Sequence, residues 1–322
     1  MIQQRSKIAK FQSLIALLLM CVVLSLLSDK FLTFANGWNV LRQISVNVCI
    51  SVGMTLVILT AGIDLSVGSI LAFSGAIAAG LLKFGIALPT YDLYIGFTLL
   101  GALLAGTVVG AALGTFNGFV ITKFKVPPFV ATLAMLTIAR GFTMLWTKGY
   151  PISSLGKEFS FIGTGWFLSI PILVWIAAIV VLLATILTNR TAFGKYIYAI
   201  GGNESAAKLS GININSVKIW VYALAGILAA VGGIMVTSRL NSAQPNAGLS
   251  YELDSIAAVV IGGTSLAGGR GTIIGTVLGA MIIGVLNNGL VLMDVSPFWQ
   301  QVVKGVVILL AVIIDKANHK EE

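Results

Sequence analysis

Long apolar runs alternate with short polar segments along nearly the whole chain. A helix that crosses a bilayer needs about 20 mainly apolar residues, and about ten segments approach this length. Because the bilayer interior offers no water to backbone polar groups, these segments are predicted to be α-helices. The pattern therefore predicts an all-α, polytopic transmembrane bundle with spans at residues 11–28, 41–60, 65–83, 93–121, 128–147, 168–188, 217–238, 252–268, 271–292 and 298–315.

The segment 252–268 is the weakest of these spans. It is short, and it ends in the glycine pairs Gly262-Gly263 and Gly268-Gly269. Interrupted helices are tolerated at membrane depth only where protein or a cavity satisfies the freed backbone groups. We therefore expect a broken or half-crossing element here.

Composition supports the membrane interpretation. The 322 residues are 57% hydrophobic and 10% charged, and the mean hydropathy is +1.00. Soluble domains carry about 25% charged residues. Too few charges are present to cover a soluble surface, so the chain is predicted to be an integral membrane protein.

The charge pattern predicts orientation rather than a nucleic-acid partner. The net charge is +9, but the basic residues stand singly between apolar runs instead of clustering on one polar face. Lys and Arg are about twice as frequent on the side that holds the N-terminus, and the positive-inside rule then places both termini in the cytoplasm. Arg5, Lys7 and Lys10 precede the run Leu14–Leu27, which lacks a cleavage signal and is predicted to remain as the first helix.

Residues for catalysis or metal binding are scarce. Cys21 and Cys49 lie in apolar runs, and the one histidine is His319. We predict no metal site and no catalytic residue. No G-x-x-x-x-G-K-[ST] phosphate loop is present, so the chain is not expected to hydrolyse ATP or to be an enzyme. A passive pore, an ion-coupled carrier and a subunit driven by a separate motor remain open.

Glycines recur every fourth residue in two predicted spans. The rows are Gly106, Gly110, Gly114 and Gly118, and Gly271, Gly275 and Gly279. Such rows let helix backbones approach closely in lipid. They predict tight helix packing, with self-association as a further use. A weak internal echo joins Val57–Gly62 to Val259–Thr264.

A polar segment at about 189–217 is the longest loop predicted on the cytoplasmic side. Residues 204–209 suit a short helix that Asn203 caps and Gly211 ends. Such a helix is either a docking element or an ordinary surface helix, and the residues alone do not choose between them.

Several runs of sequence resemble one known family. Ser205-Ala206-Ala207 followed by Gly211 is similar to the EAA loop of ABC importer permeases, although Ser205 replaces the acidic residue and Glu204 lies one position earlier. Longer runs resemble the monosaccharide permeases of that class. These runs are Gly53–Ser69, Tyr198–Glu204, Ser242–Pro245 with Tyr251–Val260, Gly262–Gly269 and Asn287-Asn288.

The resemblance implies a function and a set of partners. It implies a single permease domain over residues 1–322 in the bacterial cytoplasmic (inner) membrane, with ribose as the first substrate and xylose, galactose or an autoinducer as alternatives. The implied partners are a second permease copy, an ATPase subunit that uses ATP and Mg, and a periplasmic sugar-binding protein. The permease itself would need no cofactor and no nucleic acid. An ion-coupled sugar carrier, a branched-chain amino-acid permease and a membrane scaffold remain as other functions.

Candidate site residues fall into three groups, each with a structural alternative. Asp64, Ser66, Asn287 and Asn288 are predicted on the translocation pathway or its gate, although Asp64 also suits a helix cap and the asparagines suit interhelical hydrogen bonds. Arg140 and Lys304 are expected to snorkel or pair. Docking of the binding protein is predicted at Gln244, Glu252 and Asp254, although the two acids suit the N-terminus of the following helix equally well. Coupling to the ATPase is predicted at Asn203, Glu204, Ser205, Ala206, Ala207 and Gly211, with an ordinary surface helix as the alternative.

Overall fold

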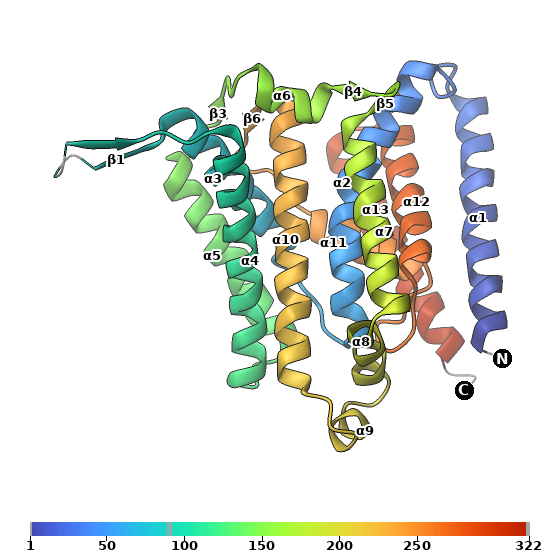
Figure 1. Cartoon of the computed structure of the whole chain (residues 1–322). Helices are drawn as coiled ribbons and strands as arrows, with labels where there is room; N and C mark the ends of the chain where they lie inside the picture. The colour runs from blue at the N-terminus through green and yellow to red at the C-terminus, as the bar shows by residue number, and fades with distance from the viewer. Residues whose placement is uncertain (1, 89, 91, 320–322) are drawn as a thin grey trace. The chain divides into compact units, whose positions relative to one another are not determined.

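The computed structural model describes residues 2–88, 90 and 92–319 and places most of them in α-helices (Figure 1). Seven of the described helices are long and apolar enough to cross a membrane, and Ser13–Leu27 and Pro297–Leu310 are shorter apolar helices. The predicted all-α, polytopic fold is therefore confirmed. The chain divides into two compact units. Unit 1 comprises residues 1–62, 177–214 and 253–322, and unit 2 comprises residues 63–176 and 215–252.

Unit 1 combines both ends of the chain with a central segment. It contains α1 (Ile2–Leu27), α2 (Phe34–Leu59), most of α7 (Ile172–Arg190), α8 (Ala192–Gly202), α9 (Glu204–Leu209), most of α11 (Tyr251–Ile261), α12 (Ile273–Leu292) and α13 (Pro297–His319). Helix α12 packs against both α1 and α2. The start of α1, the end of α13 and the short helix α9 all lie at one end of this unit (Figure 1).

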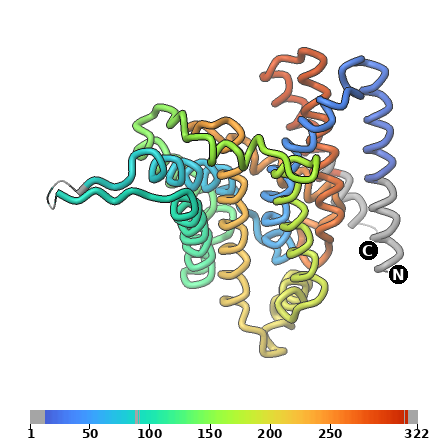
Figure 2. The backbone as a smooth tube through the Cα atoms, turned by 45° about the horizontal axis from the view of Figure 1, so that its top comes forward, coloured from blue at the N-terminus to red at the C-terminus, as the bar shows by residue number. Residues whose placement is uncertain are grey.

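Unit 2 holds the remaining helices and three two-stranded antiparallel pairs, of which β1–β2 and β4–β5 are hairpins. Its helices are α3 (Val67–Phe84), α4 (Leu99–Lys123), α5 (Pro128–Thr147), α6 (Lys157–Thr164) and nearly all of α10 (Ile214–Leu240). Its antiparallel pairs are β1 (Ile86–Leu88) with β2 (Leu93–Ile95), β3 (Ile152–Ser153) with β6 (Ser242–Ala243), and β4 (Trp166–Phe167) with β5 (Ile170–Pro171). The β1–β2 hairpin projects from the helices of this unit (Figure 2).

Threonine side chains cap the N-termini of four helices. Thr33, Thr98, Thr191 and Thr272 each accept a hydrogen bond from the backbone N–H three residues later, at 3.0–3.3 Å. These bonds satisfy N–H groups that lack a partner inside the first turn. The four threonine caps therefore define where α2, α4, α8 and α12 start.

The glycine row of α4 packs inside unit 2. A Cβ at Gly110 would come within 2.6 Å of both the Ala230 Cβ and the Gly226 carbonyl oxygen of α10. A Cβ at Gly106 would come within 2.7 Å of the Ser74 carbonyl oxygen of α3. The row thus brings three helix backbones together, and the predicted tight packing is confirmed. In unit 1, a Cβ at Gly275 or Gly279 would overlap the backbone of α11 or of the turn that follows it.

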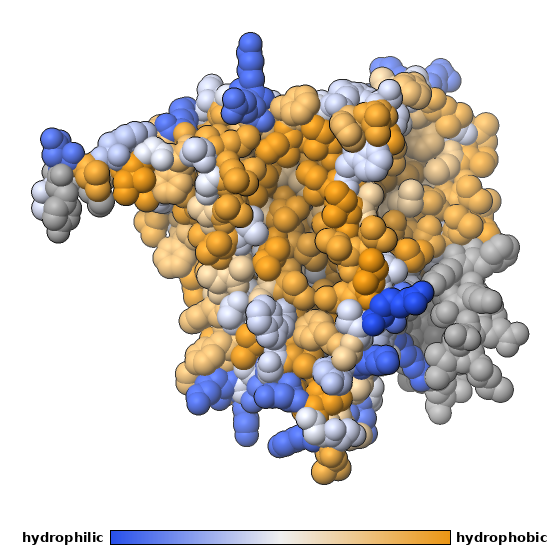
Figure 3. Space-filling model, viewed as in Figure 1, coloured by the Kyte–Doolittle hydropathy of each residue, from blue (hydrophilic) through white to orange (hydrophobic). Residues whose placement is uncertain are grey.

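The outward faces of the long helices of unit 2 are apolar. On α4, Leu100, Leu104 and Val108 are each more than half exposed. Figure 3 shows hydrophobic side chains over the middle of α4 and α10, and polar side chains near the ends of these helices. This distribution is expected of helices whose outer surface meets lipid.

Helix boundaries differ from the predicted spans in several places, and α2, for example, begins at Phe34 rather than at residue 41. The predicted spans 93–121 and 168–188 begin too early, because β2 and the β4–β5 hairpin occupy their first residues. Strand residues such as Leu93, Tyr94 and Ile95 are as apolar as helix residues, so the apolar run alone does not separate them. In the predicted span 252–268, α11 stops at Ile261, which confirms the expected break.

The weak internal echo corresponds to a shared turn in unit 1. At the end of α2, the N–H groups of Ala61 and Gly62 donate to the carbonyl oxygens of Ile58 and Val57. At the end of α11, the same pattern runs from Gly263 and Thr264 to Val260 and Val259. Ala61 and Gly263 both have positive φ, at 58° and 83°. Both helices therefore end in the same left-handed cap.

Candidate functional site

The predicted docking helix forms with the predicted bounds. Helix α9 spans Glu204–Leu209, and the Asn203 side chain accepts the Ala206 N–H at 2.9 Å. Gly211 follows with a φ of 83°, and its N–H donates to the Lys208 carbonyl. The expected cap and stop are both confirmed. The first-turn Glu204 and last-turn Lys208 also suit the helix dipole.

The surface of α9 includes an apolar residue that the sequence analysis did not single out. Leu209 is 90% exposed, whereas Ala207 is buried. Glu204, Ser205 and Ala206 are exposed. The sequence offered no clear signal for Leu209, because a single exposed leucine is common on protein surfaces. Ala207 packs in this structure, and its role in coupling stays a prediction.

Asp254 lies in a buried polar cluster rather than on a surface. Its side chain is 4% exposed, and Lys304 of α13 donates to its Oδ2 at 2.9 Å. Asn287 of α12 also hydrogen-bonds to this carboxylate. In this structure Asp254 takes part in an ion pair that joins three helices of unit 1, and its docking role stays a prediction. The expectation that Lys304 pairs is confirmed.

Asn288 is held by an amide pair. Its Nδ2 donates to the Asn36 Oδ1 at 2.9 Å, and the Asn36 Nδ2 donates back to the Asn288 Oδ1 at 3.0 Å. This reciprocal pair joins α12 to the first turn of α2. The interhelical alternative therefore describes Asn288 in this structure. Asn287 is bound to Asp254 through its side chain, but its buried Oδ1 has no hydrogen-bond partner among the described residues.

Asp64 and Ser66 meet in the turn before α3, in unit 2. The Asp64 Oδ1 accepts the Ser66 N–H at 2.8 Å and the Ser66 hydroxyl at 2.5 Å, and Asn117 of α4 donates to that hydroxyl at 2.9 Å. Ser66, not Asp64, occupies the N-cap position of α3, so the cap alternative for Asp64 is wrong. Burial raises the pKa of the Asp64 carboxyl, against the lowering effect of the two bonds from Ser66.

The Asp64 cluster carries unused hydrogen-bonding capacity. The Asp64 Oδ2 and the Tyr222 hydroxyl of α10 are both buried and have no hydrogen-bond partner within the described part of the chain. Buried polar atoms are normally paired, because an unpaired one costs about 1–3 kcal/mol. These two atoms, like the Ser74 hydroxyl of α3 in the same unit, keep hydrogen-bonding capacity that no described residue uses.

Gln244 and Glu252 belong to a segment that α5 holds in place. The Arg140 guanidinium donates from one nitrogen to the carbonyl oxygens of Pro245 and Ala247, at 2.7 and 2.8 Å. The expectation that Arg140 finds a partner is confirmed, with backbone oxygens as acceptors. Gln244 donates to the Ser242 hydroxyl at 3.1 Å. The Glu252 carboxylate lies against the backbone at Gly68.

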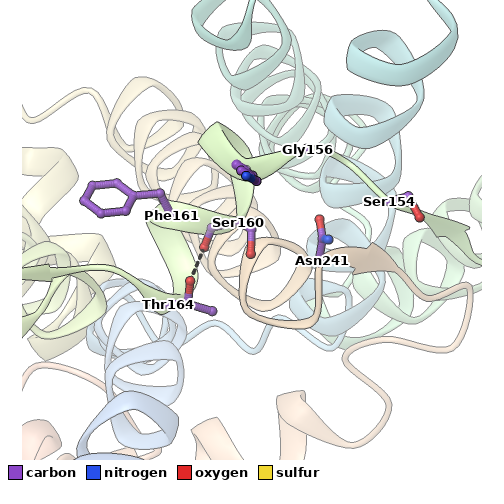
Figure 4. Close-up of a pocket in the computed structure, with 7 residues that line it drawn as sticks. Ser154, Gly156, Ser160, Phe161, Thr164 and Asn241 are labelled. Carbon is purple, nitrogen blue, oxygen red and sulfur yellow. Dashed lines mark hydrogen bonds between the residues drawn. The ribbon is translucent and has the colours of Figure 1, made fainter.

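An open pocket of about 480 Å³ lies beside α6 in unit 2. Asn241 and Ser160 face one another across it (Figure 4). Asn241 uses its Oδ1 to accept the Leu155 N–H at 3.1 Å, which leaves its Nδ2 as a donor. The lining is Ser154, Gly156, Lys157, Ser160, Phe161, Thr164 and Asn241, and these residues include no carboxylate. The sequence analysis did not single out any of them.

Comparison with known proteins decides the family. Residues 37–312 match the family described as branched-chain amino acid transport system / permease component. The chain belongs to this permease family. The match covers the seven candidate membrane spans apart from the first residues of α2, and it leaves out α1 and the end of α13. No solved structure matches the chain.

Within the family, the chain is similar to curated sugar permeases. It is 51% identical over 314 residues to the ribose import permease protein RbsC of Escherichia coli (strain K12), which is 96% of this chain and 94% of the relative. The RbsC protein of Bacillus subtilis (strain 168) is 49% identical over 309 residues, with 95% and 92% covered. The xylose transport system permease protein XylH of Haemophilus influenzae is 35% identical over 370 residues, with 96% of each chain covered.

Proposed function

We propose that this chain is the membrane permease subunit of an ATP-driven, binding-protein-dependent importer of D-ribose. The observation that carries the proposal is the level of identity. Ribose permeases from three bacterial species match at 49–51% over nearly the full length. Permeases for xylose and galactose match at 35–37%.

Two alternative functions, an amino-acid permease and an ion-coupled carrier, are less well supported. The family description mentions branched-chain amino acids, but the relatives with the highest identity given above are sugar permeases. An ion-coupled carrier would need acids that change their charge during transport. Asp254 is paired with Lys304, so Asp64 is the buried acid on which a carrier mechanism would depend. Both alternatives become outcomes of the uptake experiment described below.

The proposed mechanism is alternating access driven by other subunits. We place the chain in the bacterial inner membrane as one permease domain over residues 1–322, paired with a second copy. A separate ATPase subunit binds ATP and Mg, and a periplasmic protein delivers the sugar. The end of unit 1 that carries both termini and α9 faces the cytoplasm, as the positive-inside rule requires. This chain positions the pathway and holds no cofactor of its own.

Helix α9 is the proposed contact with the ATPase. Its capped, rigid turn stands at the cytoplasmic end of unit 1, and its exposed residues Glu204, Ser205 and Ala206 are available to a partner. Leu209, at 90% exposure, supplies the apolar anchor. In the proposed complex, the ATPase subunit covers this side chain and removes it from water.

The Asp64 cluster is the proposed polar contact of the pathway. The unpaired Asp64 Oδ2 and Tyr222 hydroxyl are able to exchange hydrogen bonds with sugar hydroxyls. Ser66 and Asn117 hold the carboxylate through a chain of hydrogen bonds, so it is oriented before the sugar arrives. Asn287, with its free Oδ1, remains a second pathway candidate in unit 1.

The α6 pocket is the proposed docking point of the binding protein. Its polar side chains include Lys157 and the donor Nδ2 of Asn241, so an acidic side chain is the complementary group. Exchanging Lys157 for Glu should weaken binding of the sugar-loaded binding protein about tenfold and steepen its salt dependence. Lys148→Glu makes the same charge change outside the pocket lining and should have a smaller effect. Equal effects of the two variants would argue against docking at the pocket.

The function is tested by uptake of labelled ribose into proteoliposomes. The chain is reconstituted with and without the ATPase subunit, ATP and the binding protein. Uptake that needs all components, with competition by ribose and not by leucine, is the expected result. Uptake by the chain alone under an ion gradient would establish the carrier function instead. Competition by leucine would establish an amino-acid permease.

A further inference from the structure

Three backbone segments of unit 1 meet at Gly201, the penultimate residue of α8. A Cβ at this position would overlap the Leu59 carbonyl oxygen at the end of α2 and the Gly269 backbone nitrogen in the turn between α11 and α12. Only glycine fits such an approach, because every other residue carries a Cβ. Gly202, one residue later, has no atom within 4 Å of its Cβ position.

The opposite side of this contact is equally close. The Gly269 N–H donates to the Leu59 carbonyl at 3.0 Å, and a Cβ at Gly269 would come within 2.7 Å of the Gly202 nitrogen. Gly268 and Gly269 have φ values of 89° and 70°, which L-residues with side chains rarely adopt. We call the mutual contact of Gly201, Gly269 and Leu59 the glycine joint.

A side-chain hydrogen bond reinforces the glycine joint. The Tyr198 hydroxyl, one turn earlier on α8, donates to the Gly271 carbonyl at 2.9 Å. Helix α8 is thereby attached at two points to the turn that leads into α12. Beyond the joint, α2 and α12 are linked by the Thr55 and Thr276 hydroxyls, 2.6 Å apart. These contacts connect α8 with both long helices.

We propose that the glycine joint transmits movement of α9 to α2 and α12. The inference rests on the proposed function, in which α9 contacts the ATPase. Asn203 alone separates α8 from α9, and its side chain caps α9, so the two short helices move together. The backbones touch without intervening side chains, so a displacement of α8 cannot be absorbed by changes of side-chain rotamer. Gly201 and Tyr198 thus act as positioning residues for energy coupling.

The experiment compares Gly201→Ala with the matched control Gly202→Ala in the complete transporter. The readout is the ratio of ribose imported to ATP hydrolysed, together with co-purification of the ATPase subunit. We expect Gly201→Ala to lower this ratio by about tenfold, within the range known for residues along a coupling route, while the ATPase subunit stays bound. Gly202→Ala should match the unsubstituted chain. Equal ratios for all three proteins would overturn the proposal.

Tyr198→Phe keeps the test decisive if Gly201→Ala fails to fold. This variant removes one hydrogen bond at the surface of the joint and leaves every backbone contact in place. It should lower the coupling ratio about threefold without reducing the yield of folded protein. A proportional loss of uptake and ATP hydrolysis, with an unchanged ratio, would indicate a merely structural role and reject the proposal.

A second readout does not depend on the substrate. Hydrogen exchange is measured on the detergent complex of the chain with its ATPase subunit, with and without a non-hydrolysable ATP analogue. The analogue should change exchange in α8 and α9 and also at residues 268–276. In Gly201→Ala, the change should stop at α8 and α9. A change at residues 268–276 that survives in Gly201→Ala would refute transmission through the joint, even if the transported molecule were not ribose.

Discussion

Lys304 of α13 donates a hydrogen bond to Asp254 of α11, 50 residues earlier in the chain, at 2.9 Å. The two side chains differ in burial, at 23% and 4% exposed, so the carboxylate depends on the lysine more than the lysine depends on it. Removal of one partner leaves an uncompensated buried charge, whereas removal of both leaves none. The pair therefore behaves as a unit.

Lys304→Met should destabilise the protein by about 3 kcal/mol, because it leaves the Asp254 carboxylate without its counterion. The double variant Lys304→Met with Asp254→Asn should recover most of this loss. Thermal unfolding of the purified protein in detergent measures both. Failure of the second substitution to restore the melting temperature would show that the pair does not act as a unit.

The Asn36–Asn288 amide pair should show measurable coupling between α2 and α12. Each single change to Ala leaves one amide without its partner, whereas the double change removes both. A double-mutant cycle on unfolding free energies should give a coupling of about 0.6–1.7 kcal/mol, the range found for interhelical hydrogen bonds in a membrane. Strictly additive single effects would contradict the pair.

Gly110→Ala should destabilise unit 2, because the new Cβ would lie 2.6 Å from the Ala230 Cβ and from the Gly226 carbonyl oxygen. Overpacking of this kind costs about 1–3 kcal/mol. Gly141→Ala in α5 is the matched control, since no atom lies within 4 Å of its Cβ position. The control should be neutral or slightly stabilising, because Ala favours helix over Gly. Comparison of the two melting temperatures decides the matter.

Leu209→Asp should weaken binding of the ATPase subunit by about tenfold or more, because it places a charge where an apolar anchor is proposed. The fold should be unaffected, since the side chain is 90% exposed. Leu32→Asp is the control: Leu32 is 75% exposed and lies between α1 and α2, away from α9. Co-purification and ATP-driven uptake measure the effect. An equal loss in both variants would argue against α9 as the contact.

Local features of this protein could be predicted from sequence, because local rules determine them. The bounds of α9 follow from Asn203 and Gly211, and the early end of α11 follows from its glycines. The hairpins that shorten α4 and α7 could not be separated from helix by apolar length alone. Thr33, Thr98, Thr191 and Thr272 offered a cap signal that the sequence analysis did not use.

Partners across the fold could not be predicted in the same way. Asn288 was open between a pathway role and a helix contact, because its partner Asn36 lies 252 residues away. Asp254 reads as a surface acid until the position of Lys304 is known. The glycine joint likewise depends on three segments that only the fold brings together. Pairing of this kind depends on tertiary structure, because a single sequence does not show which distant residues lie close in space.

The inward direction of the α4 glycine row has an evolutionary consequence. Gly106, Gly110 and Gly114 are constrained by backbones of α3 and α10, whereas Leu100 and Leu104 on the exposed face need only be apolar. Substitutions on that face can follow the thickness and lipid composition of each host membrane without disturbing the interior of unit 2. In orthologues of this permease, the variable positions of α4 should therefore recur with the period of an α-helix. The lipid-facing residues should vary, whereas the inward glycines should be retained.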